Sequence, residues 1–284
     1  MSKIAVVTDS TAYMPPELVK KNNITVAPQV LIWADQTYKD GVDIQSGEFF
    51  TRLKTAKVMP TTSQVAVISF QEIFQDLVDK DFEILALLVS SKLSGTVQSA
   101  VQARDLMGSS RDKVNIVDSQ SVAMALGFQA LALARAIEAG ASLKEAIALA
   151  EKSHEYTGVF FTPETLEFLH RGGRIGGAQR FVGTMLNMKP ILAIQDGRVE
   201  PIERIRTKSK AQDRILELVV ENVAGRTPVR LATLHANAAE DARALLTRAE
   251  EALKPIESIF AEVSPTVGTH AGPGTVGLAF MAGM

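Results

Sequence analysis

The stretch FEILALLVSS, residues 82–91, is the feature that most limits the possible folds of this chain. Its apolar residues are nearly continuous, which is typical of a strand buried on both faces of a parallel sheet. A helical pattern follows at residues 94–108, and a second strand pattern, KVNIVDS, occupies residues 113–119. Strands that alternate with helices favour right-handed crossover connections. The N-terminal half is therefore predicted to be an α/β domain built on a parallel sheet.

The first strand pattern, KIAVVTD at residues 3–9, ends in the polar sequence TDSTA. Ligands of open α/β sheets bind at the carboxyl edge of the strands. Asp9 and Ser10 are therefore candidates for a ligand-binding edge. The alternative is that Asp9 caps a helix or braces a loop.

The pattern changes in the second half of the chain. KPILAIQDGRVEPIERIRT, residues 189–207, consists of two strand-like runs around QDG, which is a hairpin signal. Helix and strand patterns alternate after it, at 210–225, 228–236, 238–254 and 256–265. This order favours helices on a mixed or antiparallel sheet. The end of the chain is rich in glycine, and we expect GTHAGPG, residues 268–274, to form a loop.

With 284 residues, the chain is long for a single core and fits two medium domains. We place the boundary near residue 158. This gives an N-terminal domain of residues 1–158 and a C-terminal domain of residues 159–284, whose last residues can return to the first domain. The predicted fold class is α/β, with a parallel sheet in the first domain and a mixed or antiparallel sheet in the second.

Composition excludes several classes of protein. The 30 lysines and arginines against 32 aspartates and glutamates give a net charge of −2, which does not favour binding to nucleic acid or to an anionic membrane. The absence of cysteine excludes disulfide bonds, a thiolate nucleophile and cysteine metal ligands. The four histidines lie far apart in the sequence, so we expect no metal site.

Targeting signals are not evident. A secretory signal needs about 7–15 apolar residues, and the N-terminal apolar run is much shorter. No stretch approaches the ~18 apolar residues of a membrane span. We therefore expect a cytoplasmic protein.

One glycine motif matches the pattern of a dinucleotide-binding site without the elements that such a site needs. Gly272, Gly274 and Gly277 have the spacing of a dinucleotide-binding loop. They lie too close to the end of the chain for the helix and second strand that such a site needs. No cofactor is therefore predicted.

Two clusters of hydroxyl side chains are the strongest candidates for a binding site. PTTSQ, residues 60–64, presents Thr61 and Thr62 behind a proline. VSSKLSGTVQSA, residues 89–100, places Ser94 at the expected N-cap of a helix, where free backbone N–H groups attract an anion. Hydroxyls donate well to a carboxylate or phosphate, but they are also common in turns and caps. Both interpretations remain open at this point.

Basic residues add two candidates in the second half. His270 lies in the glycine-rich GTHAGPG, where a histidine can donate to an anion or carry a proton. Arg204 and Arg206 belong to the positive run RVEPIERIRTKSK. Such a run is usually a solvated face, and the alternative is docking of an acidic partner or a phosphate.

In this order, the motifs resemble those of the DegV family of bacterial fatty-acid-binding proteins. The similarity extends over nearly the whole chain. The matching stretches are TDSTA (8–12), PTTSQ (60–64), SSKLSGT (90–96), VDSQSVAMALG (117–127), LEFLHRGGRIG (166–176), LNMKPIL (186–192) and GTHAGPGTVGL (268–278). One departure is that His170 and Arg171 stand where the family often has lysines, at a surface helix end away from the ligand.

The resemblance implies two α/β domains with a fatty acid bound between them. It also implies that the chain is not an enzyme but the binding-protein subunit of a bacterial fatty-acid kinase. The catalytic subunit would use ATP to convert the presented carboxyl group into an acyl phosphate for phospholipid synthesis. The residues assigned to the carboxylate by motif are Thr61 or Thr62, Ser94 and His270. Arg204 and Arg206 would meet the kinase.

A long-chain fatty acid such as palmitate or oleate places two demands on its site. Burial of about fourteen methylenes contributes on the order of 11 kcal/mol before ordering costs. The apolar stretches 121–133 and 181–194 can supply such a slot. The buried carboxylate needs donors, which hydroxyls, a helix N-terminus and one histidine provide without a stranded charge. We hypothesise that an arginine in direct contact would make the carboxylate a poorer nucleophile, so Ser94→Arg should retain lipid but slow acyl-phosphate formation.

Two other functions remain open. The first is a small hydrolase or phosphotransferase with Ser94 or Thr62 as nucleophile. His270 would then act as the base and Asp9 would orient it, although no nucleophile-elbow motif is present. The second is a binding protein for a polar small molecule, which would need more charged groups than the motifs supply. We expect a monomer.

Overall fold

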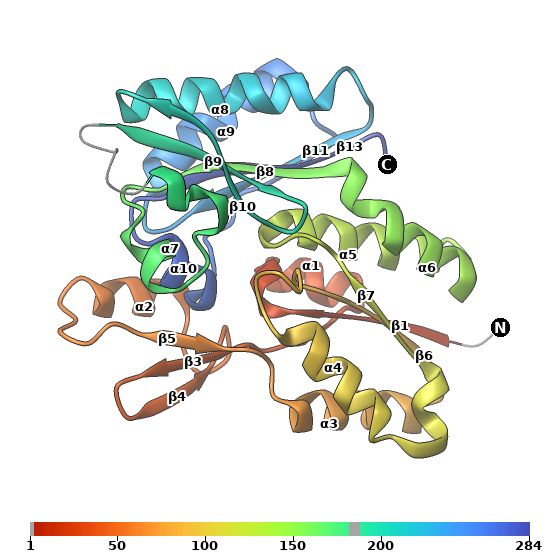
Figure 1. Ribbon diagram of the computed structural model, residues 1–284. Coiled ribbons are helices and arrows are strands. Elements are labelled where there is room, and N and C mark those ends of the chain that lie inside the picture. Colours follow the sequence, from red (N-terminus) through yellow and green to blue (C-terminus); the bar gives the residue numbers. More distant parts are fainter. Residues whose placement is uncertain (1–2, 182–187) are drawn as a thin grey trace.

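The computed structural model describes residues 3–181 and 188–284. Within these residues the strands form three sheets, of four, six and three strands. In Figure 1 the six-stranded sheet lies above the other two, and helix α5 runs between it and the four-stranded sheet. Residues 182–187, which belong to the apolar stretch 181–194 and to the motif at 186–192, lie outside the described part.

The four-stranded sheet is parallel, with the strand order β2-β1-β6-β7, and confirms the predicted N-terminal architecture. Its strands are β1 (Lys3–Asp9), β2 (Thr25–Ala27), β6 (Phe82–Leu88) and β7 (Val114–Asp118). Helices α3 (Val67–Asp79) and α4 (Thr96–Asp105) pack on one side of it, and α5 (Ala123–Glu138) and α6 (Leu143–Lys152) pack on the other.

Burial of both faces explains the continuous apolar run in β6. Ile84 and Leu88 belong to the core cluster that contains Phe70 of α3. Leu85 and Leu87 belong to the cluster that contains the buried residues of α5. Successive side chains of a strand point to opposite faces, so each position from Ile84 to Leu88 is buried on one face or the other.

The six-stranded sheet is mixed and has the order β10-β9-β8-β13-β11-β12. Its strands are β8 (Thr157–Thr162), β9 (Lys189–Gln195), β10 (Arg198–Ile205), β11 (Val229–His235), β12 (Glu257–Ile259) and β13 (Val276–Ala282). Among the described strands of this sheet, only β11 and β12 pair in parallel, and β9 and β10 form the predicted hairpin. Helices α8 (Lys208–Val223) and α9 (Ala239–Leu253) cover the outer face.

Helix α5 joins the two halves of the molecule. It contacts β1 and β6 on one side and β8, β11 and β13 on the other. A helix packed on both sides has no polar stripe, which accounts for its strongly apolar sequence AMALGFQALALARAIE. The predicted domain boundary at residue 158 falls at the start of β8, which α6 separates from α5 in the chain.

The third sheet was not predicted. It is antiparallel, has the order β4-β3-β5, and consists of β3 (Val30–Trp33), β4 (Gln36–Lys39) and β5 (Thr61–Ser63). Helix α2 (Ser46–Leu53) and helix α10 (Pro265–Ala271) lie beside this sheet. Helix α7 (Glu167–Arg171) packs against α10. The remaining helical segments are α1 (Pro16–Lys21), η1 (Ser10–Ala12), η2 (Gly108–Lys113), η3 (Ser153–Tyr156) and η4 (Gly176–Phe181).

Two local predictions are wrong. Gly95, not Ser94, is the N-cap of α4, and no side chain caps that helix end. The segment at 268–274 is not a loop in its first half, because α10 extends to Ala271. The helix forms because Ser264 caps it and Pro265 opens it, and Gly268 is needed for packing, since a Cβ there would lie 2.7 Å from the ring of Phe50.

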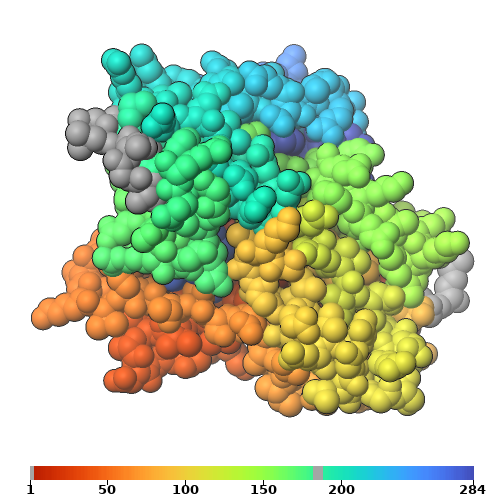
Figure 2. Space-filling model, viewed as in Figure 1, coloured from red at the N-terminus to blue at the C-terminus, as the bar shows by residue number. Residues whose placement is uncertain are grey.

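The molecular surface in Figure 2 shows where the N-terminal and C-terminal halves of the chain meet. In Figure 2 the segments around residues 160–181 and 188–205, in green to teal, rest on the segments around 50–100, in orange to yellow. Atoms of the C-terminal region, in blue, are visible in a hollow between them.

In the described ranges, no helix has the length and hydrophobicity required to cross a membrane.

Candidate functional site

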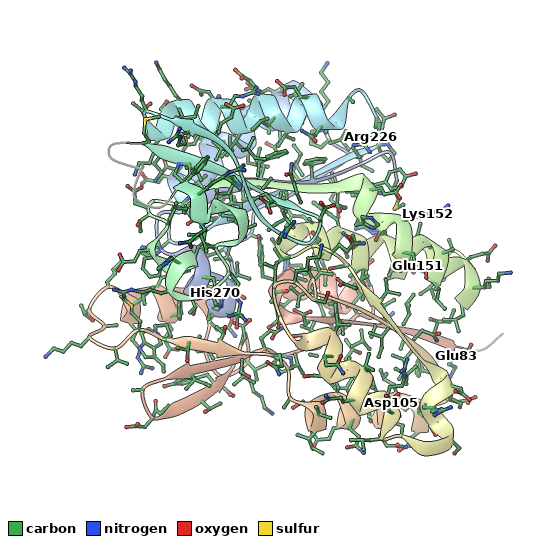
Figure 3. All side chains as sticks on the ribbon, viewed as in Figure 1. Glu83, Asp105, Glu151, Lys152, Arg226 and His270 are labelled. Carbon is green, nitrogen blue, oxygen red and sulfur yellow. The ribbon has the colours of Figure 1, made fainter. Side chains whose placement is uncertain are left out.

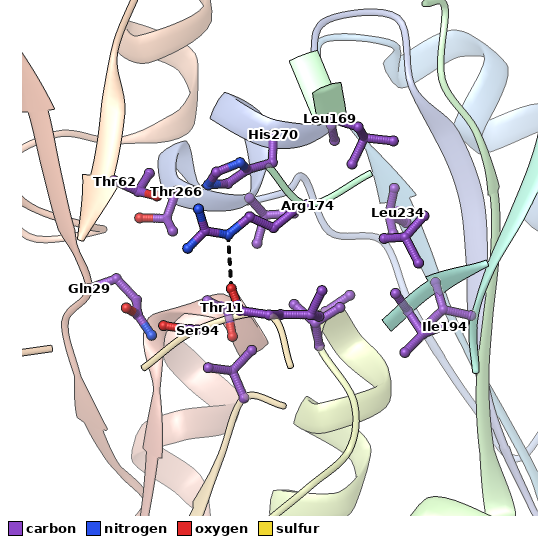
Figure 4. A pocket seen from close by; sticks show the side chains of 18 of the residues that line it. Thr11, Gln29, Thr62, Ser94, Leu169, Arg174, Ile194, Leu234, Thr266 and His270 are labelled. Carbon is purple, nitrogen blue, oxygen red and sulfur yellow. Dashed lines mark hydrogen bonds between the residues drawn. The ribbon is translucent and has the colours of Figure 1, made fainter. Parts of the chain in front are cut away.

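A pocket lies between the N-terminal segments and the six-stranded sheet, and it is amphipathic (Figure 4). Its apolar wall includes Val122, Phe161, Leu169, Ile194, Val199 and Leu234. The polar lining residues gather at the other end, toward β5 and α10, where Figure 4 labels Thr11, Gln29, Thr62, Ser94, Arg174, Thr266 and His270. A ligand with one polar end and one apolar end fits such a lining.

Thr62 and His270 meet at the polar end of the pocket. The Oγ1 atom of Thr62 lies 2.7 Å from Nε2 of His270, although the two residues are 208 positions apart. Thr62 is in β5, where neighbouring side chains point to opposite faces, and Thr61 is exposed. The structure thus brings Thr62, and not Thr61, to this pocket beside His270.

His270 is held neutral and in place by its surroundings. Burial, with a smaller effect from the nearby charge of Arg174, lowers the pKa of His270 to about 4. Its ring packs directly against Gly172, because a Cβ at that position would lie 2.1 Å from Nδ1. Figure 3 shows His270 in the interior of the molecule, whereas the labelled charged residues Glu83, Asp105, Glu151, Lys152 and Arg226 lie on its periphery.

Ser94 lies across the pocket from Thr62 (Figure 4). It follows β6 in the loop before α4, so the carboxyl edge of the parallel sheet positions it. Its Oγ atom lies 2.8 Å from Oγ1 of Thr96. The three predicted residues Thr62, Ser94 and His270 therefore line one pocket, although they come from three separate parts of the chain.

Arg174 is a pocket residue that the sequence interpretation missed. Its Nε donates to the carbonyl oxygen of Leu93 at 2.9 Å, and its Nη1 donates to that of Gly172 at 2.7 Å. These two carbonyls hold the guanidinium beside Ser94 and His270 in Figure 4. The expectation that only uncharged donors surround the head group is therefore incomplete.

Thr266 is a second residue that was missed. It is buried and lines the pocket, and its Oγ1 has no hydrogen-bond partner among the described residues. A buried hydroxyl without a partner is unfavourable, so a polar ligand atom would improve its environment. Its helix, α10, was predicted as a loop, so no local signal placed Thr266 near Thr62.

The other candidates lie elsewhere. Asp9 caps η1 by accepting from the backbone N–H of Thr11, and it also accepts from Gln29 and Val89, so it braces the sheet edge and does not orient His270. Arg204 and Arg206 are exposed at the end of β10, outside the pocket lining, and the guanidinium of Arg204 lies 5.2 Å from the ring of Phe181. Across residues 3–181 and 188–284, no group of three or more histidines and acids could hold a metal ion.

Comparison with known proteins identifies close structural relatives. A family model described as "Uncharacterised protein, DegV family" matches residues 3–283. The Bacillus subtilis protein named DegV is 33% identical over 278 residues, covering 97% of this chain and 98% of that protein. Its crystal structure, described as a fatty acid binding protein, has a TM-score of 0.90 and 31% identity, and covers 99% of this chain and 100% of that one. A fatty-acid-binding DegV family protein of Thermus thermophilus has a TM-score of 0.92 and 34% identity, with 99% of both chains covered.

Proposed function

The chain belongs to the DegV family, and we propose that it binds one long-chain fatty acid in the pocket between its two halves. The carboxylate lies at the polar end, near β5 and α10, and the tail extends along the apolar wall. The related proteins of Thermus thermophilus and Bacillus subtilis are described as fatty-acid-binding, which supports this ligand class.

The observation that carries the proposal is the division of the pocket into a polar and an apolar end. Thr62, Ser94 and His270 are donors from three distant segments, and they gather at one end. The opposite lining is aliphatic and aromatic, as a hydrocarbon tail requires. At about 0.8 kcal/mol per buried CH₂, such a wall supplies most of the binding free energy, and the head group supplies orientation.

The polar end suits a carboxylate that must remain reactive. His270 is neutral at physiological pH because burial lowers its pKa to about 4, so it acts as a hydrogen-bond donor and not as a counter-ion. With Nε2–H donating to Thr62, the threonine hydroxyl is free to donate to the ligand. Arg174 adds one positive charge beside the head group, tied to two backbone carbonyls.

We further propose that the protein presents the bound carboxyl group to a fatty-acid kinase, as its family resemblance implies. A partner with an acidic surface could dock on Arg204 and Arg206, which are exposed at the end of β10. These residues lie outside the pocket lining, so docking and lipid binding use different side chains.

Mass spectrometry of the purified protein tests the ligand class. Under native conditions we expect a mass increment equal to one fatty acid, which disappears on denaturation and is identified in the organic extract. An empty protein that also fails to bind added palmitate and oleate would refute the proposal.

The geometry gives less support to a hydrolase that uses Ser94 and His270. The hydroxyl of Ser94 bonds to Thr96, and the ring of His270 bonds to Thr62. Asp9, the expected orienting residue, is bonded to Gln29 and to backbone N–H groups instead. Labelling of Ser94 by a serine-directed phosphonate would revive the enzyme hypothesis.

A further inference from the structure

A chain of buried polar groups continues from Ser94 through Thr96 and Gln29, which also lines the pocket, to Asp9. Ser94 Oγ lies 2.8 Å from Thr96 Oγ1, and Gln29 Nε2 lies 2.9 Å from Thr96 Oγ1 and 3.1 Å from Asp9 Oδ1. Asp9 and Thr96 are fully buried and Gln29 is 1% exposed. Water therefore does not compete for these hydrogen bonds, and their directions are set by the groups themselves.

The carboxylate of Asp9 fixes the direction at the inner end. It accepts from the backbone N–H of Thr11 at 3.0 Å, from the hydroxyl of Thr11 at 2.7 Å and from the backbone N–H of Val89 at 2.7 Å. Burial raises the pKa of Asp9, and these donors act in the opposite direction because they favour the ionised form. An acceptor surrounded in this way requires the amide of Gln29 to turn its NH₂ group, and not its oxygen, toward Asp9.

The orientation of Gln29 then sets the orientation of Thr96. One N–H of the amide is directed to Asp9 and the other to Thr96 Oγ1, which becomes an acceptor. The hydroxyl proton of Thr96 has two possible acceptors, Ser94 Oγ at 2.8 Å and Gln29 Oε1 at 3.2 Å. The shorter contact, to Ser94, is the more favourable one.

We propose that Asp9, Gln29 and Thr96 are positioning residues that aim the hydroxyl proton of Ser94 into the pocket, toward an anionic head group. Ser94 Oγ accepts from Thr96, so its own proton is left for the ligand. This inference rests on the proposed function. It adds a reason for ligand selectivity, because a chain of aligned hydrogen bonds strengthens the bond to a charged carboxylate more than the bond to an uncharged alcohol.

Thr96→Val tests this chain of hydrogen bonds, because valine keeps the shape of the threonine side chain and removes its hydroxyl. We expect the Kd for palmitate to rise about tenfold and the Kd for hexadecanol to change less than twofold, as measured by displacement of a fluorescent fatty acid. In a Ser94→Ala background the same substitution should have no further effect on palmitate binding. Thr96→Ser, which restores a hydroxyl, should recover affinity.

Thr233→Val is the matched control, because Thr233 is an equally buried hydroxyl that bonds Ala261 and does not line the pocket. Should Thr96→Val fail to fold, Gln29→Met removes the amide that donates to Thr96, one step further along the chain, and the same losses are expected. The positioning role would be overturned if Thr96→Val raised the Kd values for palmitate and hexadecanol equally, or if it raised the Kd for palmitate equally with and without the Ser94 hydroxyl. Neither result would contradict fatty-acid binding itself. A wild-type protein that binds no palmitate would overturn both proposals.

Discussion

Gly172→Ala is the substitution whose effect follows most directly from the packing of the site. Gly172 ends helix α7 with right-handed backbone angles, so alanine is compatible with its backbone. The added Cβ would lie 2.1 Å from Nδ1 and 2.7 Å from Cε1 of His270. The obstacle to this substitution is therefore the imidazole ring and not the main chain.

The expected loss of affinity can be worked out from these contacts. Ordinary Cβ contacts begin near 3.4 Å, so the ring of His270 must move by about 1.3 Å in a close-packed interior. A shift of that size away from Thr62 breaks their 2.7 Å hydrogen bond. The carboxylate then loses an aligned, charge-assisted donor worth about 1.5–3 kcal/mol, which corresponds to a Kd about 10- to 150-fold higher.

Isothermal titration with palmitate measures the change, and thermal unfolding reports whether the variant is folded. Gly47→Ala is the matched control, since a Cβ at Gly47 in helix α2 meets no atom within 4 Å. We expect that control to bind palmitate normally and to be slightly more stable than wild type. If Gly172→Ala binds palmitate as tightly as wild type, the idea that His270 must keep its position is wrong.

Three further predictions concern the site and its surroundings. Thr62→Ala and Ser94→Ala should each raise the Kd for palmitate about tenfold in the same titration; wild-type affinity in both and in the double variant would contradict their assignment. Arg204→Glu and Arg206→Glu should leave palmitate binding unchanged and reduce acyl-phosphate formation with a fatty-acid kinase, whereas equal turnover would exclude them from docking. Burial raises the pKa of Asp40 from 3.8 to about 6, so its contribution to stability is present at pH 4 and is lost as the pH rises through 6. The Tm of Asp40→Asn relative to wild type should therefore increase between pH 4 and pH 7, and a difference that does not change with pH would refute this.

Much of the secondary structure is predictable because its signals are local. The central strand β6 is recognisable from its unbroken apolar run, since both of its faces are buried. The hairpin of β9 and β10 follows from the turn sequence QDG between two strand-like runs. Thr62, Ser94 and His270 stand near the ends of predicted elements, but it is the resemblance to the family that assigns Thr61 or Thr62, Ser94 and His270 to one ligand.

The parts that could not be predicted depend on contacts between distant segments. The strands β3, β4 and β5 are only three or four residues long and gain their stability from pairing and from α10. Glycines suggested a loop at α10, whereas Gly268 is required there because Phe50 approaches closely. Arg174 belongs to the motif LEFLHRGGRIG, but the motif does not indicate which of its residues faces the pocket, because the position of Arg174 depends on the carbonyl of Leu93 in a different segment.

The position of α10 has a consequence for the synthesis of this protein. Thr62 is translated 208 residues before His270, to which it bonds. Asp40 is translated 226 residues before Thr266, whose backbone N–H it accepts. At about 5–20 residues per second, the strand that contains Thr62 waits roughly 10–40 s on the ribosome for the helix that completes the polar end of the pocket. A nascent chain stalled before residue 265 should therefore not retain palmitate, even when β6 and α5 have already emerged and folded. Lipid capture would thus follow the synthesis of α10, and the part of the apolar wall already made is exposed to chaperones or to premature aggregation until then.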